Sequence, residues 1–225
     1  RPSPMDFGTE SLLAIDLLNA AEKLNPGREK NALALSLCYH FYGDFTDSLS
    51  ALSKAVPEHC KSDFLWMAAV NYIALHEYDQ AQLLFQEIVD SETDLIHLFW
   101  ALYAIIYYKH LNNEEPNEVM IPFRKCVLQI DAEKENSCSW FTADAEDMLE
   151  HAIPILLLFG ENKDYNWLKE KQSELLMSDA EKAFLNKQSG TQKNAVLKEF
   201  SSRWNSAKAI VFDLFEYREP QKTSP

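Results

Sequence analysis

The chain has 225 residues, of which 47% are hydrophobic, and this length and composition exclude wholesale disorder and allow a substantial core. Its formal net charge of −14 opposes direct binding to nucleic acid or to an anionic membrane surface, because both are themselves negatively charged. The longest strongly apolar run, Ile153 to Gly160, is far shorter than the roughly 20 residues that a membrane span needs. Only 5 glycines occur and long segments are rich in Leu, Ala, Glu and Lys, so we predict an all-α fold.

The ends of the chain and its cysteines bear on where the protein works. No signal-peptide pattern stands at the start, and the four cysteines are scattered without a Cys-x-x-Cys pair. We therefore expect reduced thiols and a cytoplasmic location rather than secretion. Because the first residue is Arg1 and not Met, we expect processing or excision from a longer protein. Residues 1–8 and 218–225 are predicted to be disordered.

Two stretches in the first half share one pattern at a constant offset. They are "YGDFTDSLSALSKAV", from Tyr42 to Val56, and "HEYDQAQLLFQEIV", from His76 to Val89. Similar residues recur 33 positions apart at Ala32–Leu65, Ser36–Ala69, Tyr39–Tyr72, Phe45–Tyr78, Ser48–Ala81, Leu52–Phe85 and Ala55–Ile88. A single offset kept over all these pairs indicates a structural repeat and not a coincidence of amphipathic helices.

A small residue followed by an aromatic one, twice over a period near 34, resembles the tetratricopeptide repeat. The order continues at Trp100, Ala104, Tyr107, Val119, Phe123 and Cys126, across a longer turn that contains Pro116. It is preceded by a half unit at Ala14, Leu18, Ala21 and Pro26. The resemblance implies one half repeat and three whole repeats over residues 9–131, stacked as antiparallel helix hairpins in a right-handed superhelix.

Residues 132–217 are predicted to extend the same superhelix with a divergent helical hairpin and a C-terminal capping helix. The last helix, from about Asn194 to Tyr217, carries an apolar stripe with alternating spacings of three and four residues. The stripe contains Leu197, Phe200, Trp204, Val211 and Leu214. Three interpretations stay open: the stripe caps the last hairpin, folds into the groove of the superhelix, or forms a homodimer.

The sequence offers no convincing catalytic, metal or cofactor site. Gly-rich phosphate loops, His-Glu-x-x-His and Gly-x-Ser-x-Gly motifs are absent. The acid–histidine pairs Asp94/His97 and Asp147/His151 have helical spacing and are interpreted as surface pairs. Adjacent His59 and Cys60 lie in a turn, where neighbouring side chains seldom meet as a nucleophile and its base. We therefore predict that the protein is not an enzyme and needs no cofactor.

The resemblance also indicates a candidate binding groove on the concave side. Some tetratricopeptide domains use Lys, Arg and Asn on the first helices to clamp a carboxylate, but the matching positions here are the apolar Leu33, Leu37, Met67, Leu98 and Leu102. The predicted groove residues are Leu33, Leu37, Phe41, Trp66, Met67, Val70, Ile73, Ile105 and Tyr108. Two interpretations stay open for them, namely intramolecular core or a groove for an apolar peptide or helix with basic flanks.

The function that these features favour is a non-enzymatic protein-interaction scaffold that holds a segment of a protein partner. One alternative is a regulatory or sensory domain of a longer protein, such as a bacterial transcription activator. A second alternative is an acidic chaperone that shields an apolar client segment.

Overall fold

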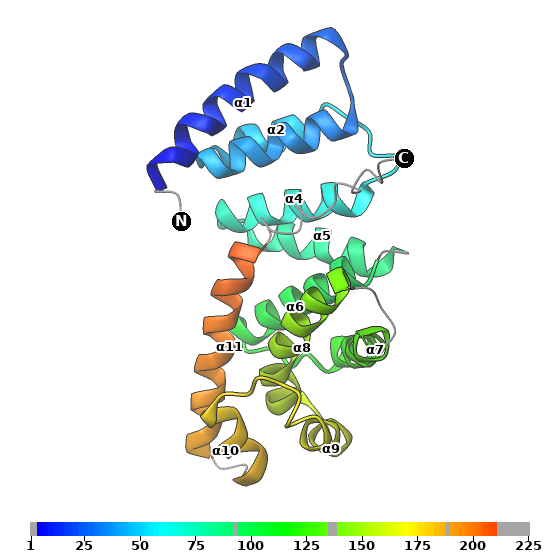
Figure 1. Ribbon diagram of the computed structural model, residues 1–225, viewed down its shortest axis with the longest axis vertical. Coiled ribbons are helices and arrows are strands. Elements are labelled where there is room, and N and C mark those ends of the chain that lie inside the picture. The colour runs from blue at the N-terminus through cyan, green and yellow to red at the C-terminus, as the bar shows by residue number, and fades with distance from the viewer. Residues whose placement is uncertain (1–3, 92–93, 135–138, 188–189, 211–225) are drawn as a thin grey trace. The chain divides into compact units, whose positions relative to one another are not determined.

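The computed structural model describes residues 4–91, 94–134, 139–187 and 190–210, and every regular element in these ranges is an α-helix (Figure 1). The prediction of an all-α chain is confirmed for this part of the protein. Its eleven helices pack mainly against their neighbours in the sequence. None of the described helices combines the length and the apolar character that crossing a bilayer requires.

The chain divides into two compact units, the first ending at Glu114 and the second beginning at Glu115. The helices of the first unit are α1 (Pro4–Leu24), α2 (Glu29–Tyr42), α3 (Phe45–Leu52), α4 (Lys61–Ala74), α5 (Tyr78–Asp90) and α6 (Leu95–Leu111). Those of the second are α7 (Asn117–Lys134), α8 (Ser139–Phe159), α9 (Asn162–Glu170), α10 (Asp179–Lys187) and α11 (Gly190–Ile210). The third predicted repeat, which comprises α6 and α7, is therefore shared between the two units.

In the first unit, α2 packs on α3 and α4 packs on α5. Each pair is joined by a turn of only two or three residues, so its helices run in opposite directions. Ser36, Ala69 and Ala104, the small residues predicted to allow close helix contacts, are fully buried. The equivalent partners on the second helices, Ser48 and Ala81, are fully buried as well. Small side chains at these positions let neighbouring backbones approach closely.

Three helices of the first unit end in the same left-handed turn. Gly43, His76 and Asn113 have φ angles of 89°, 62° and 57° and follow α2, α4 and α6. At Gly43 the backbone N–H bonds to the His40 carbonyl, and the next N–H bonds to the Tyr39 carbonyl. The same pair of bonds, to carbonyls three and five residues earlier, closes the turns at His76 and Asn113. This is the Schellman arrangement, and its first two occurrences are 33 residues apart, as the sequence repeat is.

A buried network of neutral polar groups joins the first hairpin to α4. The Ser48 hydroxyl donates to the Ser36 carbonyl at 2.7 Å and accepts from the Asn71 amide at 2.8 Å. The Ser36 and Ser48 hydroxyl oxygens are also 2.7 Å apart. Asn71 Nδ2 donates to the Met67 carbonyl, and Asn71 Oδ1 lies 2.7 Å from His40 Nδ1. Ser36, Ser48 and Asn71 are fully buried, so these bonds replace the water that each group loses on folding.

The second unit is held instead by buried charge pairs. Arg124 of α7 donates two hydrogen bonds to the carboxylate of Asp164 in α9, at 2.6 and 2.8 Å. Arg203 of α11 donates to Glu181 of α10 at 2.9 Å and to the backbone carbonyl of Glu150 in α8. The hydrogen bonds that Arg124 donates to Asp164 raise the pKa of Arg124. The first pair joins α7 to α9, and Arg203 joins α11 both to the preceding helix α10 and to α8.

Several predicted boundaries differ from those in the structure. Residues 4–8, predicted as disordered, form the first turns of α1. In the predicted divergent hairpin, α9 ends at Glu170, and α8 continues through Pro154 without interruption. The longer turn predicted around Pro116 ends there, because α7 begins directly after Pro116, whose carbonyl accepts from the N–H groups of Val119 and Met120. The predicted disordered segment 218–225 lies outside the described residues.

Candidate interaction surface

The predicted groove residues fall into covered and accessible groups. The buried members are Trp66, Met67, Val70, Ile105 and Tyr108. The half-buried members are Leu33, Leu37 and Ile73. Phe41 is exposed, at 42%. Burial therefore favours the intramolecular-core interpretation for the first group, whereas the groove itself stays a prediction.

Trp66 packs inside the first unit. It is 5% exposed, and its ring lies 5.3 Å from that of Phe85 and 6.4 Å from that of His97. These neighbours belong to α5 and α6, so Trp66 of α4 fills the space between three consecutive helices. Of the two interpretations left open for Trp66, its burial favours intramolecular core. Both faces of α4 are apolar, and the sequence pattern therefore could not distinguish its covered side from its open side.

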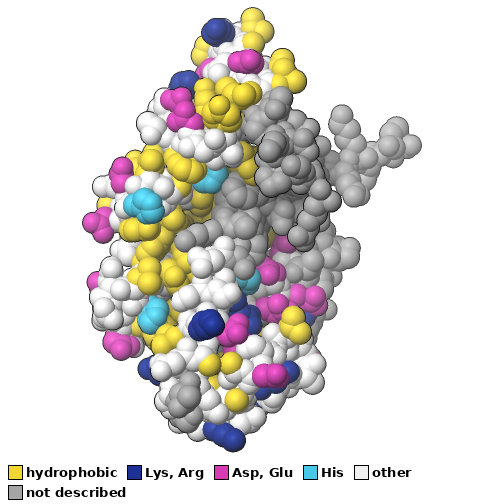
Figure 2. Space-filling model, turned by 90° about the vertical axis from the view of Figure 1, so that its left-hand side faces the viewer, with side chains coloured by type: hydrophobic (Ala, Val, Ile, Leu, Met, Phe, Trp, Pro, Cys, Tyr) yellow, Lys and Arg dark blue, Asp and Glu magenta, His cyan; other side chains and the backbone are white. Residues whose placement is uncertain are grey.

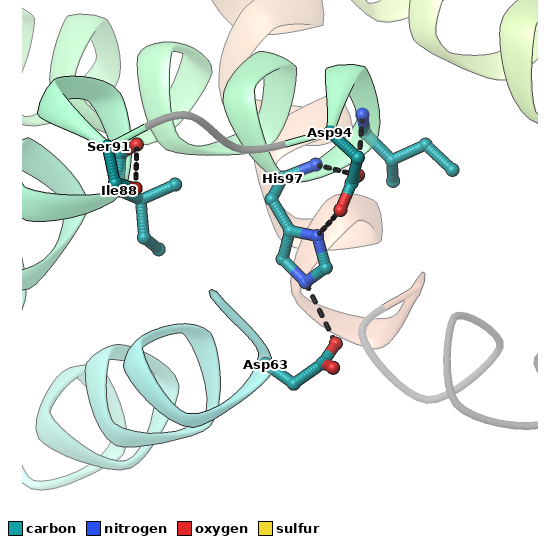
Figure 3. Close-up of polar contacts among 6 residues, drawn as sticks. Asp63, Ile88, Ser91, Asp94 and His97 are labelled. Carbon is teal, nitrogen blue, oxygen red and sulfur yellow. Dashed lines mark hydrogen bonds and ion pairs between the residues drawn. The ribbon is translucent and has the colours of Figure 1, made fainter. Parts of the chain in front are cut away.

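His97 is buried between two carboxylates, and this corrects its interpretation as part of a surface pair (Figure 3). Its Nδ1 lies 2.7 Å from Asp94, the N-cap residue of α6, and its Nε2 lies 3.1 Å from Asp63 of α4. Burial by itself would lower the pKa of His97, but the hydrogen bonds to Asp63 and Asp94 outweigh it and raise that pKa. The imidazole thus ties the start of α6 to the start of α4. His151 is likewise buried and not on the surface, with its Nδ1 2.8 Å from the Asp147 carbonyl oxygen.

The left-handed turns of the first unit carry exposed apolar side chains. We define the turn edge as Phe41, Tyr42, Tyr78 and Leu111, which are between 42% and 53% exposed. Each lies within two residues of Gly43, His76 or Asn113. Figure 2 faces the side on which these turns lie and shows hydrophobic side chains gathered among histidines. Of the turn edge, sequence reasoning identified only Phe41, although the repeated turns offered a signal for the others.

Aromatic contacts hold part of the turn edge in place. The Tyr78 ring lies 5.4 Å from that of buried Tyr108, and its hydroxyl is 2.9 Å from His76 Nδ1. Burial raises the pKa of Tyr108, and the neighbouring Tyr78 raises it further. In the preceding repeat, Phe45 lies at the position of Tyr78 and makes an edge contact with His40 at 5.1 Å. Rings packed on fixed neighbours lose little freedom on binding, and this makes them suitable contact residues.

Acidic residues follow each of the three left-handed turns. Asp44, Glu77 and Glu114 come directly after Gly43, His76 and Asn113. Asp47 and Asp79 add exposed carboxylates in the first turns of α3 and α5. Lys109 pairs with Glu114 at 3.4 Å. The apolar turn edge is thus bordered by negative charge, which would attract basic flanks of a ligand.

The C-terminal stripe is partly covered by its own unit. Phe200 and Trp204 of α11 are buried and Leu197 is half-buried, whereas Val211 and Leu214 lie outside the described residues. Helix α11 packs on α8 and α10, and the Phe200 ring lies 6.2 Å from that of Phe159. A capping helix would pack in this way. The homodimer and the capping role both stay predictions.

The cysteines in the described residues are free thiols. Burial raises the pKa of Cys126 to about 12 and also raises that of Cys38. The pKa of Cys60 is raised to about 12 by burial and by the carboxylate of Glu29, to which its thiol donates at 2.9 Å. A catalytic cysteine needs a lowered pKa, so Cys60 is not activated as a nucleophile in this arrangement.

Comparison with known proteins does not assign the chain to a family. No family model matches the chain, and no curated protein or solved structure is significantly similar to it.

Proposed function

We propose that this protein is a non-enzymatic helical-repeat scaffold, similar to tetratricopeptide proteins, whose first unit binds a segment of a partner protein. Support for the repeat comes from the offset of 33 residues, which recurs in both sequence and turn geometry. The hairpins α2–α3 and α4–α5 have small residues at equivalent helix contacts. Stacked hairpins of this type present extended surfaces for peptide segments.

The observation that carries this proposal is the exposed turn edge. Aromatic side chains such as Tyr42 and Tyr78 supply large contact areas with few rotatable bonds, and aromatic residues are enriched where proteins bind one another. Most residues of the predicted concave groove are instead covered or half-covered. We therefore place the binding surface at the turn edge and not in the groove.

The chemistry of the turn edge defines its partner. Apolar side chains at Phe41, Tyr42, Tyr78 and Leu111 call for apolar residues in the ligand, and the bordering carboxylates call for Lys or Arg beside them. Because the charges lie at an exposed rim, they would mainly raise the association rate and set orientation. The ligand is a short apolar segment with basic flanks.

A positional-scanning peptide library measured by fluorescence anisotropy tests this proposal. We expect the selected peptides to combine apolar and basic residues, and we expect Tyr42→Ser and Tyr78→Ser to weaken their binding by about tenfold or more, as loss of an aromatic contact residue does. Leu83→Ser is the matched control, since Leu83 is 65% exposed on α5 but five residues from Tyr78. The absence of any selected peptide, or an equal loss with Leu83→Ser, would contradict the proposal.

A further inference from the structure

A second site lies where the α3–α4 loop meets the start of α2. Glu29, Glu58 and His59 each place a potential metal ligand atom within 4.8 Å of the other two. Glu29 is the first residue of α2, and Glu58 and His59 belong to the loop before α4. These residues come from the first hairpin and from the loop that follows it, and take no part in the turn edge.

The Glu29 carboxylate is held in a fixed orientation. Its Oε2 accepts from the backbone N–H groups of His59 and Cys60, at 3.0 and 3.2 Å, and from the Cys60 thiol at 2.9 Å. These three bonds hold the carboxylate of Glu29 against the backbone at the start of α4. All three act on one oxygen, which leaves Oε1 directed toward the imidazole of His59.

The remaining oxygen and the imidazole are already held together by a hydrogen bond, with Glu29 Oε1 3.1 Å from His59 Nδ1. A bound ion would replace this bond and hold the two atoms slightly further apart. Two ligands of a tetrahedral ion with bonds of 2.0–2.1 Å are about 3.3 Å apart. The Glu58 side chain is exposed and can move its carboxylate toward both atoms. A third ligand can thus be added without disturbing a helix.

We propose that Glu29, Glu58 and His59 bind a divalent transition ion, Zn²⁺, with water in the fourth position. One imidazole and two carboxylates form a donor set that suits Zn²⁺, whereas Mg²⁺ and Ca²⁺ prefer six or more oxygen ligands. Cys60 acts as a positioning residue that orients Glu29 through its second oxygen, a role that outer partners commonly have in zinc sites. The ion would link the start of α2 to the loop between the two hairpins.

Zn²⁺ titration of the metal-stripped chain against a chromogenic chelator tests this site. We expect one equivalent to bind, with Mg²⁺ in excess unable to compete. His59→Gln and Glu58→Gln should each weaken binding by at least about tenfold, since even the loss of an outer partner costs this much. His76→Asn, which removes an exposed imidazole from a turn of the same unit, should bind as the unaltered chain does.

Thermal unfolding supplies an independent measurement. Zn²⁺ should raise the melting temperature of the unaltered chain and of His76→Asn, because an ion that binds only the folded state stabilises it. It should leave Glu58→Gln unchanged, and because Glu58 is exposed this variant should melt like the unaltered chain without metal. The inference is overturned if no Zn²⁺ binds, or if His59→Gln and His76→Asn bind it equally, as they would with scattered surface imidazoles.

Discussion

The Ser36–Ser48–Asn71 network of the first unit and the Arg124–Asp164 pair of the second satisfy buried polar groups in different ways, although the first unit also buries His97 between two carboxylates. In the first unit, Ser36, Ser48 and Asn71 form a network of neutral hydroxyl and amide groups between neighbouring helices. In the second unit, Arg124 and Asp164, which are 40 positions apart and carry full charges, pair with one another. The networks differ in what happens when one member is lost, because a neutral group left without a partner costs far less than an unpaired buried charge.

The two kinds of network should therefore differ in whether their members can be replaced by neutral residues without loss of stability. The first unit can replace Ser36 and Ser48 by Ala69 and Ala81 at the equivalent positions of the next hairpin and keep the same helix contacts. In the second unit, a neutral residue in place of Arg124 would leave the buried carboxylate of Asp164 on α9 without its cation. Three predictions test how far this contrast extends.

The largest effect is expected from Arg124→Met. It leaves the carboxylate of Asp164, which is 4% exposed, buried without its cation. We expect the free energy of unfolding to fall by about 3–5 kcal/mol, measured by urea denaturation. The double variant Arg124→Met with Asp164→Leu should recover most of that loss. A single variant as stable as the unaltered chain would show that this pair does not hold α7 to α9.

A smaller effect, which depends on pH, is expected from His97→Gln. The folded-state pKa of His97 is raised by Asp63 and Asp94, above the unfolded value of about 6.5. The stabilisation is therefore fully present below the unfolded pKa and is lost as pH rises through the folded pKa. The variant should lose about 1.5–3 kcal/mol at pH 5.5, as charge-assisted hydrogen bonds are worth, and less at pH 8.5.

His40 is the internal control for this prediction. Burial lowers its pKa despite the hydrogen bond to Asn71, so its neutral form is favoured in the folded state. Its contribution to stability therefore falls as pH falls, opposite in sign to that of His97. Denaturation of His97→Gln and His40→Gln across pH should show divergent trends, and parallel curves would refute the assignment of His97 as an imidazolium.

The smallest effect is expected from Ser36→Ala. Ser48 keeps its bonds to the Ser36 carbonyl and to Asn71, so no buried group loses its last partner. Thermal denaturation should show a loss below about 1 kcal/mol. The reciprocal change Ala69→Ser introduces a hydroxyl at a fully buried position beside Ala81 and should cost about 1–3 kcal/mol. Equal losses of stability for Ser36→Ala and Ala69→Ser would show that the two hairpins do not differ in their need for polar side chains at these positions.

Local patterns in the sequence predicted the helices of the first unit well. The offset between Tyr39 and Tyr72 located two equivalent hairpins, and the small residues Ser36 and Ala69 marked their close contacts. Pro116 marked the start of α7, because proline lacks the backbone donor that a helix interior needs. Such features depend on residues within one helix or turn, or on regular spacing.

The remaining features depend on which helix faces which. The bonds between His97 and Asp63, and between Arg124 and Asp164, join side chains 34 and 40 positions apart without any shared motif. The sequence also did not show on which side of α4 Trp66 lies, because apolar residues occur on all sides of that helix. For the candidate surface, Phe41 was predicted but Tyr42, Tyr78 and Leu111 were not, because exposure at a turn depends on the neighbouring repeat.

The left-handed residue at position 76 has a consequence for local opening. Gly43 adopts its positive φ without a Cβ, but His76 at the equivalent turn carries a side chain that makes this conformation unfavourable by about 1–2 kcal/mol. Local unfolding begins where the structure gains least from staying closed. Amide hydrogens around the junction of α4 and α5 should therefore exchange with solvent sooner than those around the junction of α2 and α3, so that the first unit opens more readily at the α4–α5 turn.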